Sequence, residues 1–577
     1  MFKFSDVKDG MRRDFNVDIV MSDGNVLRAD VLRPDDDKKH PVILTYGPYA
    51  KGLAFQDGYK EAWTAMTHDH PDIPYGSSNL YQSWELVDPE KFVPDGYICL
   101  RIDSRGCGCS EGHIDCYSDR ETQDIYECIE WAACQPWSNG KIGMCGISYY
   151  SQNAWMVAQH NPPHLTAMII WEGCGDLYRD GSHHGGIQSE FFPDWYNNQV
   201  VSVQYGRGDR GFKSRVTGEN VSGEINLTNE ELAANRDDME DVFTKHPMCD
   251  EYYKSMVTEY EKVKVPFLSA TNWGGIGMHT RGNIEGFMRA GSELKWLETH
   301  GDEHWTSFYT DYGVNMQKKF FGYFLKGEDN GWMDTPKVQL QVRYPFERFV
   351  PRAENEWPLA RTQYKKFYLH QDYTLSQEPP ESSAPMTYAA MGDGYTFLTQ
   401  PFEEETEICG HIASQMRISS DTVDADIFLA IRLFTPNMKE ITFIGSNDPR
   451  TPISLGWLRA SHRKLDPERS TFYMPYHTHD EYQPLIPGEK YDLDIEILPT
   501  SIVVPKGYRL ALTLRGKDYE TAATEVPYGP HNYSGVGPHR HTNAINRPMS
   551  IFDNNVTVYF DVDSKPYILL PIIPPKG

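Results

Sequence analysis

Residues 140–160 place the strongest constraint on the fold, because a short apolar strand, a glycine-marked sharp turn and a helix follow one another there (GKIGMCGISYYSQNAWMVAQH). Such a junction is typical of α/β proteins with a mostly parallel sheet. Ser148 stands at the turn, where its side chain is lifted out of the backbone beside the amides that open the helix. A hydroxyl in this place can act as a nucleophile, since an oxyanion formed next to it meets donors already in position.

The turn departs from the G-x-S-x-G pattern at one position. Gly146 matches the first glycine, whereas Tyr150 stands where the second glycine belongs. The turn alone therefore fits either a nucleophile elbow or an ordinary strand-to-helix junction.

The order of the predicted elements indicates two domains and one insertion. Strands alternate with helices from Val17 to about Ile170, and the pattern resumes later, which predicts an α/β domain over residues 1–340. Aromatic, polar and charged residues predict a helical cap inserted at residues 177–262. Short strands separated by turn residues rich in Pro and Gly predict an antiparallel β-sandwich over residues 341–577.

Composition excludes several classes of partner. The 577 residues carry a formal net charge of −27, so nucleic acid and anionic membrane surfaces would be repelled. No apolar run reaches the roughly 18 residues needed to span a bilayer, and the N-terminus lacks a signal core, so we expect a cytoplasmic enzyme.

The distribution of the 10 cysteines indicates reduced thiols in a reducing compartment. Cys107 and Cys109 lack a second ligand pair at zinc spacing, and we expect no metal and no cofactor.

A serine nucleophile needs a base, and the candidates lie at the far end of the predicted sheet. The segment 297–305 (LETHGDEHW) follows a predicted strand and holds His300 and His304. His304 lies in the loop beyond the strand, where its ring can reach Ser148, whereas His300 at the strand end is expected to pack or cap. His304 is therefore the predicted base.

Two donors are expected to form an oxyanion hole. Tyr149 follows the nucleophile and supplies its backbone amide. Tyr49 lies in the loop after the first strongly apolar strand (YGPYAKG, 46–52) and can present its phenol to the same space. A glycine-rich loop at residues 101–112 (RIDSRGCGCSEG) is interpreted as scaffold that lines the site. Asp103 and Arg105 in this loop are a candidate ion pair.

Seven segments, in this order, resemble the X-Pro dipeptidyl-peptidase and cocaine esterase family of α/β-hydrolases, which also includes α-amino acid ester hydrolases and glutaryl acylases. They are YGPYAK (46–51), DSRGCGCSEG (103–112), IEWAACQPW (129–137), GISY (146–149), DLYR (176–179), GWLRASHR (456–463) and PGE (487–489). The resemblance implies an α/β-hydrolase domain with a helical cap insertion and a C-terminal all-β jelly-roll sandwich. It also implies Ser148 as nucleophile, His304 as base, and Tyr49 and Tyr149 as oxyanion donors.

The acid of the catalytic triad departs from the family pattern. The family's carboxylate usually sits in a Trp-x-Asp block, but here the segment 272–279 (NWGGIGMH) places Gly275 at that position. A missing acid can cost up to about 10⁴ in rate. Glu172, at the carboxyl end of the preceding sheet strand, is the predicted replacement, since a buried carboxylate needs a partner and His304 would serve. The alternatives, in descending order, are Asp176, Glu285 and Asp302.

These residues predict a serine hydrolase that cleaves an ester or amide bond of a small-molecule acyl substrate through an acyl-enzyme intermediate. Three alternatives stay open: an X-Pro dipeptidyl-peptidase-type aminopeptidase, an acyl transferase that uses the same residues, and a non-catalytic binding protein whose triad is broken at Gly275. The resemblance further implies a homo-oligomer, expected as a dimer.

Overall fold

The N-terminal domain is built on one mixed sheet. Its strands pair in the order β1-β2-β3-β5-β4-β6-β7-β10-β11-β12, antiparallel as far as β5 and parallel from β5 to β12, and β13 (Arg348–Glu354) pairs antiparallel with β12. The computed structural model describes residues 2–381, 383–521 and 535–574. The strands of this sheet are β1 (Phe4–Lys8), β2 (Met11–Val20), β3 (Val26–Arg33), β4 (His40–Gly47), β5 (Ile98–Asp103), β6 (Ser138–Ile147), β7 (Leu165–Trp171), β10 (Phe267–Asn272), β11 (Lys295–His300) and β12 (Val338–Tyr344).

Helices cover both faces of the parallel part of the sheet, which is why strands such as β5 are buried along their whole length. One face packs its apolar side chains against α4, α5 and α10, while α11 and α12 lie with the other face. The side chain of Ser118 caps α4 by accepting a hydrogen bond from the Glu121 amide. These helices are α4 (Asp119–Ala133), α5 (Tyr149–Ala158), α10 (Thr280–Arg289), α11 (Thr306–Tyr309) and α12 (Asp311–Phe321).

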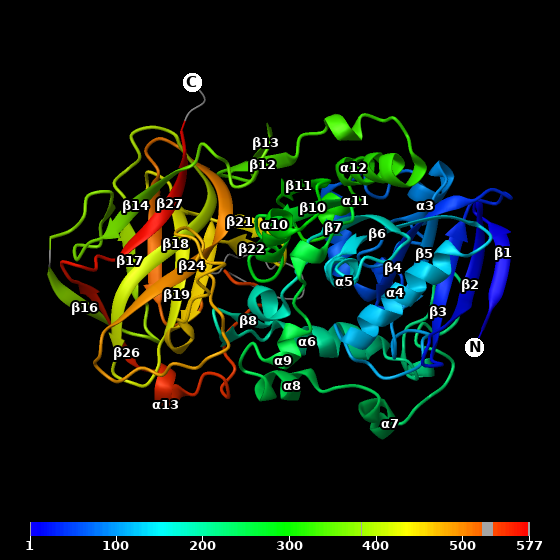
Figure 1. The fold of residues 1–577 in the computed structure, drawn as a ribbon, viewed down its shortest axis with the longest axis horizontal. Helices are drawn as coiled ribbons and strands as arrows, with labels where there is room; N and C mark the ends of the chain where they lie inside the picture. Colours follow the sequence, from blue (N-terminus) through cyan, green and yellow to red (C-terminus); the bar gives the residue numbers. More distant parts are fainter. Residues whose placement is uncertain (1, 382, 522–534, 575–577) are drawn as a thin grey trace.

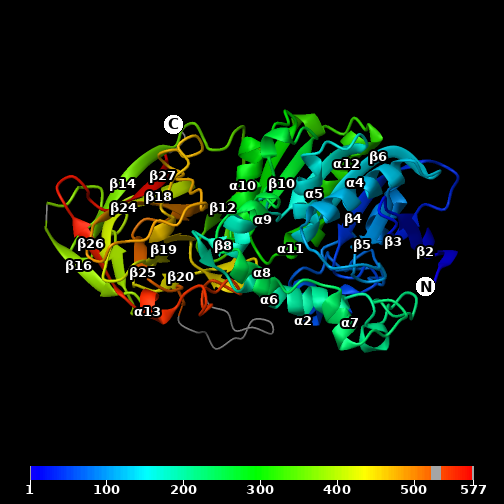
Figure 2. The ribbon, with the colours of Figure 1, turned by 60° about the horizontal axis from the view of Figure 1, so that its bottom comes forward.

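The segment predicted as a cap folds into short helices and one small hairpin. The helices are α6 (Phe191–Trp195), α7 (Asn229–Ala234), α8 (Met239–Lys245) and α9 (Glu251–Lys254), and the hairpin is β8 (His183–His184) with β9 (Ile187–Gln188). Figures 1 and 2 show α6, α8 and α9 along one side of the molecule, with β8 at the junction of the two large domains.

The C-terminal domain is an antiparallel β-sandwich, as the sequence predicts. In one sheet β18 pairs with β24 on one edge and with β26 and β27 on the other, and in the second sheet the order is β23-β19-β25-β17. Buried aliphatic side chains of both sheets form the core between them. Its strands include β17 (Tyr395–Leu398), β18 (Thr406–Ser420), β19 (Asp426–Phe434), β23 (Ser454–Arg459), β24 (Tyr491–Val504), β25 (Arg509–Arg515), β26 (Asn555–Phe560) and β27 (Tyr567–Ile573). The predicted fold class is confirmed.

Two of the contacts between the domains lie at the ends of sheet strands. Arg343 at the end of β12 is paired with Ile502 of β24, and its buried guanidinium donates to the carbonyls of Ser501 (3.2 Å) and Ile453 (2.9 Å). The turn between β21 (Phe443–Gly445) and β22 (Asp448–Thr451) reaches back to the first domain, where the Ser446 amide donates to the Gly274 carbonyl over 3.1 Å. The second contact brings a residue of the β-sandwich to the end of β10.

Among the helices of the described residues, none has the length and apolar character needed to cross a membrane.

Candidate active site

Ser148 occupies a strained turn between β6 and α5. Its backbone has φ 56° and ψ −111°, a conformation that a residue other than glycine rarely adopts. The Ser148 amide donates to the Trp171 carbonyl at the end of β7 (3.1 Å), which fixes the turn at the carboxyl edge of the sheet. The side chain is half-buried. This geometry matches a nucleophile elbow.

The close packing at this turn explains how Tyr150 replaces the second glycine of the motif. A Cβ at Gly47, on β4, would lie 2.5 Å from Cε1 of Tyr150, and a Cβ at Gly146 would lie 2.6 Å from the Tyr150 Cβ. The Tyr150 ring therefore fills the space beside these two glycines. Gly47 on the neighbouring strand thus allows the close approach of the Tyr150 ring.

Glu172 and His304 meet beside this turn. Glu172 follows β7 with φ 46°, and its amide donates to the Ala270 carbonyl of β10 over 2.8 Å. The His304 ring donates from Nδ1 to Glu172 Oε2 over 2.8 Å, and both side chains are buried. Strand β7 thus supplies a carboxylate to a ring that comes from the loop after β11.

The charges of this pair stabilise each other. Burial raises the pKa of Glu172, but the His304 and His300 rings outweigh burial and hold this pKa well below its ordinary range. Burial likewise lowers the pKa of His304, but the Glu172 and Glu85 carboxylates outweigh it and raise the pKa to about 10. At neutral pH the ring is therefore an imidazolium in this arrangement.

His300 is part of the same network, which corrects the expectation that it only packs or caps. Its Nε2 donates to Glu172 Oε1 over 3.1 Å, and its Nδ1 donates to Glu298 Oε2 over 2.7 Å. Burial lowers its pKa, but these two carboxylates raise it to about 9. Glu172 is consequently held between two imidazoles.

Gly275 leaves room for a further partner of Glu172. A Cβ at Gly275 would lie only 3.2 Å from the Ser446 hydroxyl, so this hydroxyl fills the place of a side chain there. It donates to Glu172 Oε2 over 2.7 Å, while the Ser446 carbonyl accepts from the His304 amide over 3.1 Å. Sequence reasoning missed Ser446, because it belongs to the other domain.

We expect Ser446→Ala to lower kcat about tenfold or more, since a hydrogen bond to a charged group contributes about 1.5–3 kcal/mol. The loss should affect turnover more than the thermal unfolding midpoint. The matched control is Ser454→Ala, which removes another buried hydroxyl of the β-sandwich, one that donates to the Leu498 carbonyl over 2.7 Å. Equal losses of kcat in the two variants would contradict a specific role for Ser446.

Tyr49 lies next to the turn, where an oxyanion would form. Its ring centroid is 6.1 Å from that of Tyr149 and 5.8 Å from that of Tyr150. The Tyr49 oxygen accepts a hydrogen bond from Nε1 of Trp195 in α6 (3.0 Å), which leaves its own hydrogen available for donation. Helix α5 begins at Tyr149, so the Tyr149 amide has no intrahelical acceptor. Trp195 gave no signal in the sequence.

The other nitrogen of His304 is occupied by a residue that the sequence analysis did not single out. Nε2 donates to Glu85 Oε1 over 2.9 Å, and Glu85 is also buried. Within the described part of the chain, the Ser148 hydroxyl takes part in no hydrogen bond. The structure therefore places Ser148, His304 and Glu172 at one edge of the sheet, with Glu85 at the nitrogen that faces away from Glu172.

The alternative acids lie in other ion pairs. Asp176 pairs with Arg179 over 2.8 Å. Glu285 pairs with Arg281 over 2.8 Å, and Asp302 pairs with His70 over 3.0 Å. Each carboxylate is thus engaged away from the His304 ring.

The predicted Asp103–Arg105 ion pair is wrong. Asp103 accepts hydrogen bonds from the Lys51 and Cys109 amides (2.6 and 2.8 Å), and its carboxylate lies 3.3 Å from Lys51 Nζ. Arg105 instead pairs with Asp124 over 2.9 Å. Asp103 ends a buried strand, so backbone amides rather than the nearest arginine satisfy its carboxylate. All ten cysteines, Cys107 and Cys109 among them, are free thiols.

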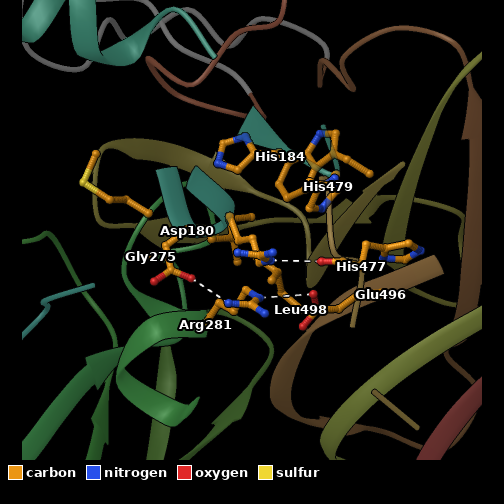
Figure 3. A pocket seen from close by; sticks show the side chains of 13 residues that line it. Asp180, His184, Gly275, Arg281, His477, His479, Glu496 and Leu498 are labelled. Atoms are coloured by element: carbon orange, nitrogen blue, oxygen red, sulfur yellow. Dashed lines mark hydrogen bonds and ion pairs between the residues drawn. The ribbon is translucent and has the colours of Figure 1, made fainter. Parts of the chain in front are cut away.

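A polar pocket lies at the junction of the two domains (Figure 3). Arg281 spans it, with ion pairs to Asp180 (2.9 Å) and Glu496 (3.1 Å). The pocket is lined from the hydrolase side by Gly275, but Ser148 and His304 do not line it.

Buried histidines gather around this junction, and six of them are here called the interdomain histidine cluster: His183, His184, His462, His477, His479 and His539. The ring of His462 lies 3.1 Å (Nδ1 to Nδ1) from that of His479, and Nδ1 of His184 lies 2.8 Å from Nε2 of His541. Burial, together with neighbouring cations and imidazoles, lowers the pKa of every member of the cluster. These rings are neutral at neutral pH.

Comparison with known proteins gives matches in both domains. Residues 23–304 match the model of the X-Pro dipeptidyl-peptidase family (S15 family), and residues 330–548 match the model of the X-Pro dipeptidyl-peptidase C-terminal non-catalytic domain. The cocaine esterase of Rhodococcus sp. is 27% identical over 394 residues, which cover 61% of this chain and 62% of that protein.

Solved structures give the same result. A CocE/NonD family hydrolase from Staphylococcus aureus superposes with a TM-score of 0.84 at 29% identity, over 98% of this chain and 94% of that one. An aminopeptidase from a marine sediment Thaumarchaeota archaeon shares the fold, with a TM-score of 0.70 at 16% identity over 99% of this chain and 98% of that chain. The chain thus belongs to the X-Pro dipeptidyl-peptidase and cocaine esterase family of α/β-hydrolases.

Proposed function

We propose that this protein is a serine hydrolase that cleaves an ester or amide bond of a small-molecule acyl substrate through an acyl-enzyme intermediate. The observation that carries the proposal is the 2.8 Å contact between His304 Nδ1 and Glu172 Oε2 beside Ser148. This contact supports Glu172 as the acid in place of the carboxylate that is missing at Gly275. The missing carboxylate is the one argument for a non-catalytic protein.

The proposed roles follow from the positions of these groups. Once its Nε2 is free of a proton, His304 takes the proton of Ser148 while Oγ attacks the acyl carbon, and Glu172 stabilises the imidazolium that forms. The Tyr149 amide and the Tyr49 phenol donate to the oxyanion. The imidazolium then protonates the leaving group, and water repeats the sequence to release the acid.

An esterase or acylase is preferred over a dipeptidyl-peptidase. The likeness to the Rhodococcus cocaine esterase supports ester cleavage. Assays of Xaa-Pro anilides beside chromogenic acyl esters test the alternative, an X-Pro dipeptidyl-peptidase-type aminopeptidase. The ten free thiols support a reducing compartment, which agrees with a cytoplasmic enzyme.

A fluorophosphonate probe tests whether Ser148 is an activated nucleophile. We expect the wild-type protein to be labelled once per chain, and Ser148→Ala to abolish both labelling and hydrolysis of acyl esters, since loss of a triad serine removes on the order of 10⁶ in kcat. Ser151→Ala is the matched control, because its hydroxyl lies in the same helix and donates to the Gly146 carbonyl over 2.7 Å. Labelling of Ser148→Ala, or of neither protein, would reject the proposal.

A further inference from the structure

Glu85 lies directly beside the nucleophile turn. Its carbonyl accepts a hydrogen bond from the Ile147 amide over 3.1 Å, one residue before Ser148, and its backbone adopts φ 64°. A conformation of this kind costs about 1–3 kcal/mol in a residue other than glycine and is often found at functional sites. The backbone therefore holds the Glu85 side chain in a position that local preference does not explain.

Within the described residues, His304 is the one cationic partner of the Glu85 carboxylate. Oε1 accepts from His304 Nε2 over 2.9 Å, while Oε2 accepts no hydrogen bond within the described residues. The surrounding side chains are mainly aromatic: Trp84 stacks on Tyr59 at 3.6 Å between ring centroids and lies 5.3 Å from Trp305. A buried carboxylate in such surroundings depends on its single cationic partner.

This contact conflicts with catalysis as the site stands. With Glu172 at Nδ1, Nε2 is the only ring nitrogen that can take the Ser148 proton. In the structure both nitrogens donate to carboxylates, so the ring has no free lone pair. The Ser148 hydroxyl can become a nucleophile only after the contact with Glu85 is broken.

A charged Glu85 also opposes the next step. Burial and then the Glu85 charge raise the pKa of the Tyr49 phenol well above its ordinary value, which indicates that this carboxylate lies near the proposed oxyanion donor. Negative charge that develops on the acyl oxygen would be repelled by the same carboxylate. While it is charged and in place, Glu85 thus acts against the reaction through its contact with His304 and through its charge near Tyr49.

The other titratable groups around the His304 ring do not release it. Glu172 lies at the end of β7, and His300 of β11 acts through Glu172. His279, before α10, stacks on the His304 ring with centroids 5.1 Å apart, and burial and the His304 charge lower its pKa to about 3. His539 of the β-sandwich also has a lowered pKa, mainly through burial, and the His304 charge adds to that lowering. Glu85 is the group whose loss frees Nε2.

We propose that Glu85 holds Nε2 of His304 in the resting enzyme, so that Ser148 becomes reactive only when this carboxylate releases the ring. This inference rests on the proposed function. Release requires that the Nε2–H bond breaks and its proton passes to solvent, which removes the attraction between ring and carboxylate. The lone pair on Nε2 then accepts the Ser148 proton as the Oγ–H bond breaks and the bond from Oγ to the acyl carbon forms.

The pH dependence of labelling by a fluorophosphonate tests this role without knowledge of the natural substrate. In the wild type the second-order rate of Ser148 labelling should rise with pH through a midpoint well above about 6.5, the ordinary value of an imidazole. In Glu85→Gln the midpoint should fall by at least about one pH unit, and the rate at neutral pH should rise about tenfold.

Glu90→Gln is the matched control, because Glu90 lies five residues away and its Oε2 accepts instead from Ser77 and Ser78. Its midpoint should equal that of the wild type. An unchanged midpoint in Glu85→Gln, or a lower rate at every pH with an unchanged unfolding temperature, would overturn the role of Glu85. If Glu85→Gln fails to fold, the wild type still decides, since a midpoint near about 6.5 overturns the proposal. A protein that is labelled at no pH would instead reject the serine hydrolase function.

Discussion

Replacing Glu172 by glutamine is expected to lower kcat for an acyl ester by about 10⁴ while the protein stays folded. The amide would present its NH₂ group to Nδ1 of His304 and would favour the tautomer that carries its hydrogen on Nε2. That tautomer cannot accept the Ser148 proton. The substitution also removes the charge that stabilises the imidazolium during attack.

Asp176→Asn is the matched control for this prediction. Asp176 pairs with Arg179 over 2.8 Å, so its neutralisation should change the free energy of unfolding more than kcat. Steady-state kinetics at saturating ester, with thermal unfolding of each variant, separate the two effects. A larger loss of kcat in Asp176→Asn than in Glu172→Gln would transfer the role of the acid to Asp176.

Acid should destabilise this protein steeply, because of the interdomain histidine cluster. The six rings are neutral in the folded protein, with pKa values of about 3 for His184 and His462 and about 4 for His477, whereas unfolded histidines titrate near about 6.5. Below that pH the unfolded chain binds protons that the folded chain cannot. Each histidine that stays neutral in the folded protein then reduces the free energy of unfolding by up to about 1.4 kcal/mol per pH unit.

The stability that these neutral histidines contribute should therefore be fully present above the pKa of an unfolded histidine. It should be lost as the pH falls below that value towards the pKa values of the folded protein. His300 and His304 act in the opposite sense: their raised pKa values of about 9 and about 10 contribute stability below about pH 6.5 that is lost as the pH rises towards those values.

Urea unfolding between about pH 5 and about pH 8 measures this effect. We expect His477→Gln to reduce the slope of stability against pH, since its ring no longer takes up a proton on unfolding. His68→Gln, at a side chain that is 85% exposed, should leave the slope unchanged. A flat dependence in the wild type down to about pH 5 would contradict neutral rings in the cluster.

The sequence predicted the residues whose positions follow from strand ends. Ser148 and Glu172 each follow a buried parallel strand, and parallel strands that pair in register bring their carboxyl ends to one edge. His304 follows from the same argument applied to the loop after β11. The alternation of strands and helices therefore sufficed to bring together groups that are far apart in the chain.

The remaining site residues come from places where no such rule applies. Glu85 lies in a loop without regular structure, Trp195 in a short helix of the cap segment, and Ser446 in a turn of the other domain. Their side chains reach the site through loop geometry that composition does not encode. The error at Asp103 has a similar cause, since a buried carboxylate can be satisfied by backbone amides as well as by the nearest arginine.

The turn that carries Ser446 has a consequence for hybrid enzymes. Because the hydroxyl opposite Gly275 comes from the second half of the gene and the acid that it serves comes from the first, a crossover placed between the halves would exchange one without the other. If one parent has an aspartate at the position of Gly275, the side chain of that aspartate would clash with Ser446 in such a chimera. Functional hybrids should therefore inherit both positions from the same parent.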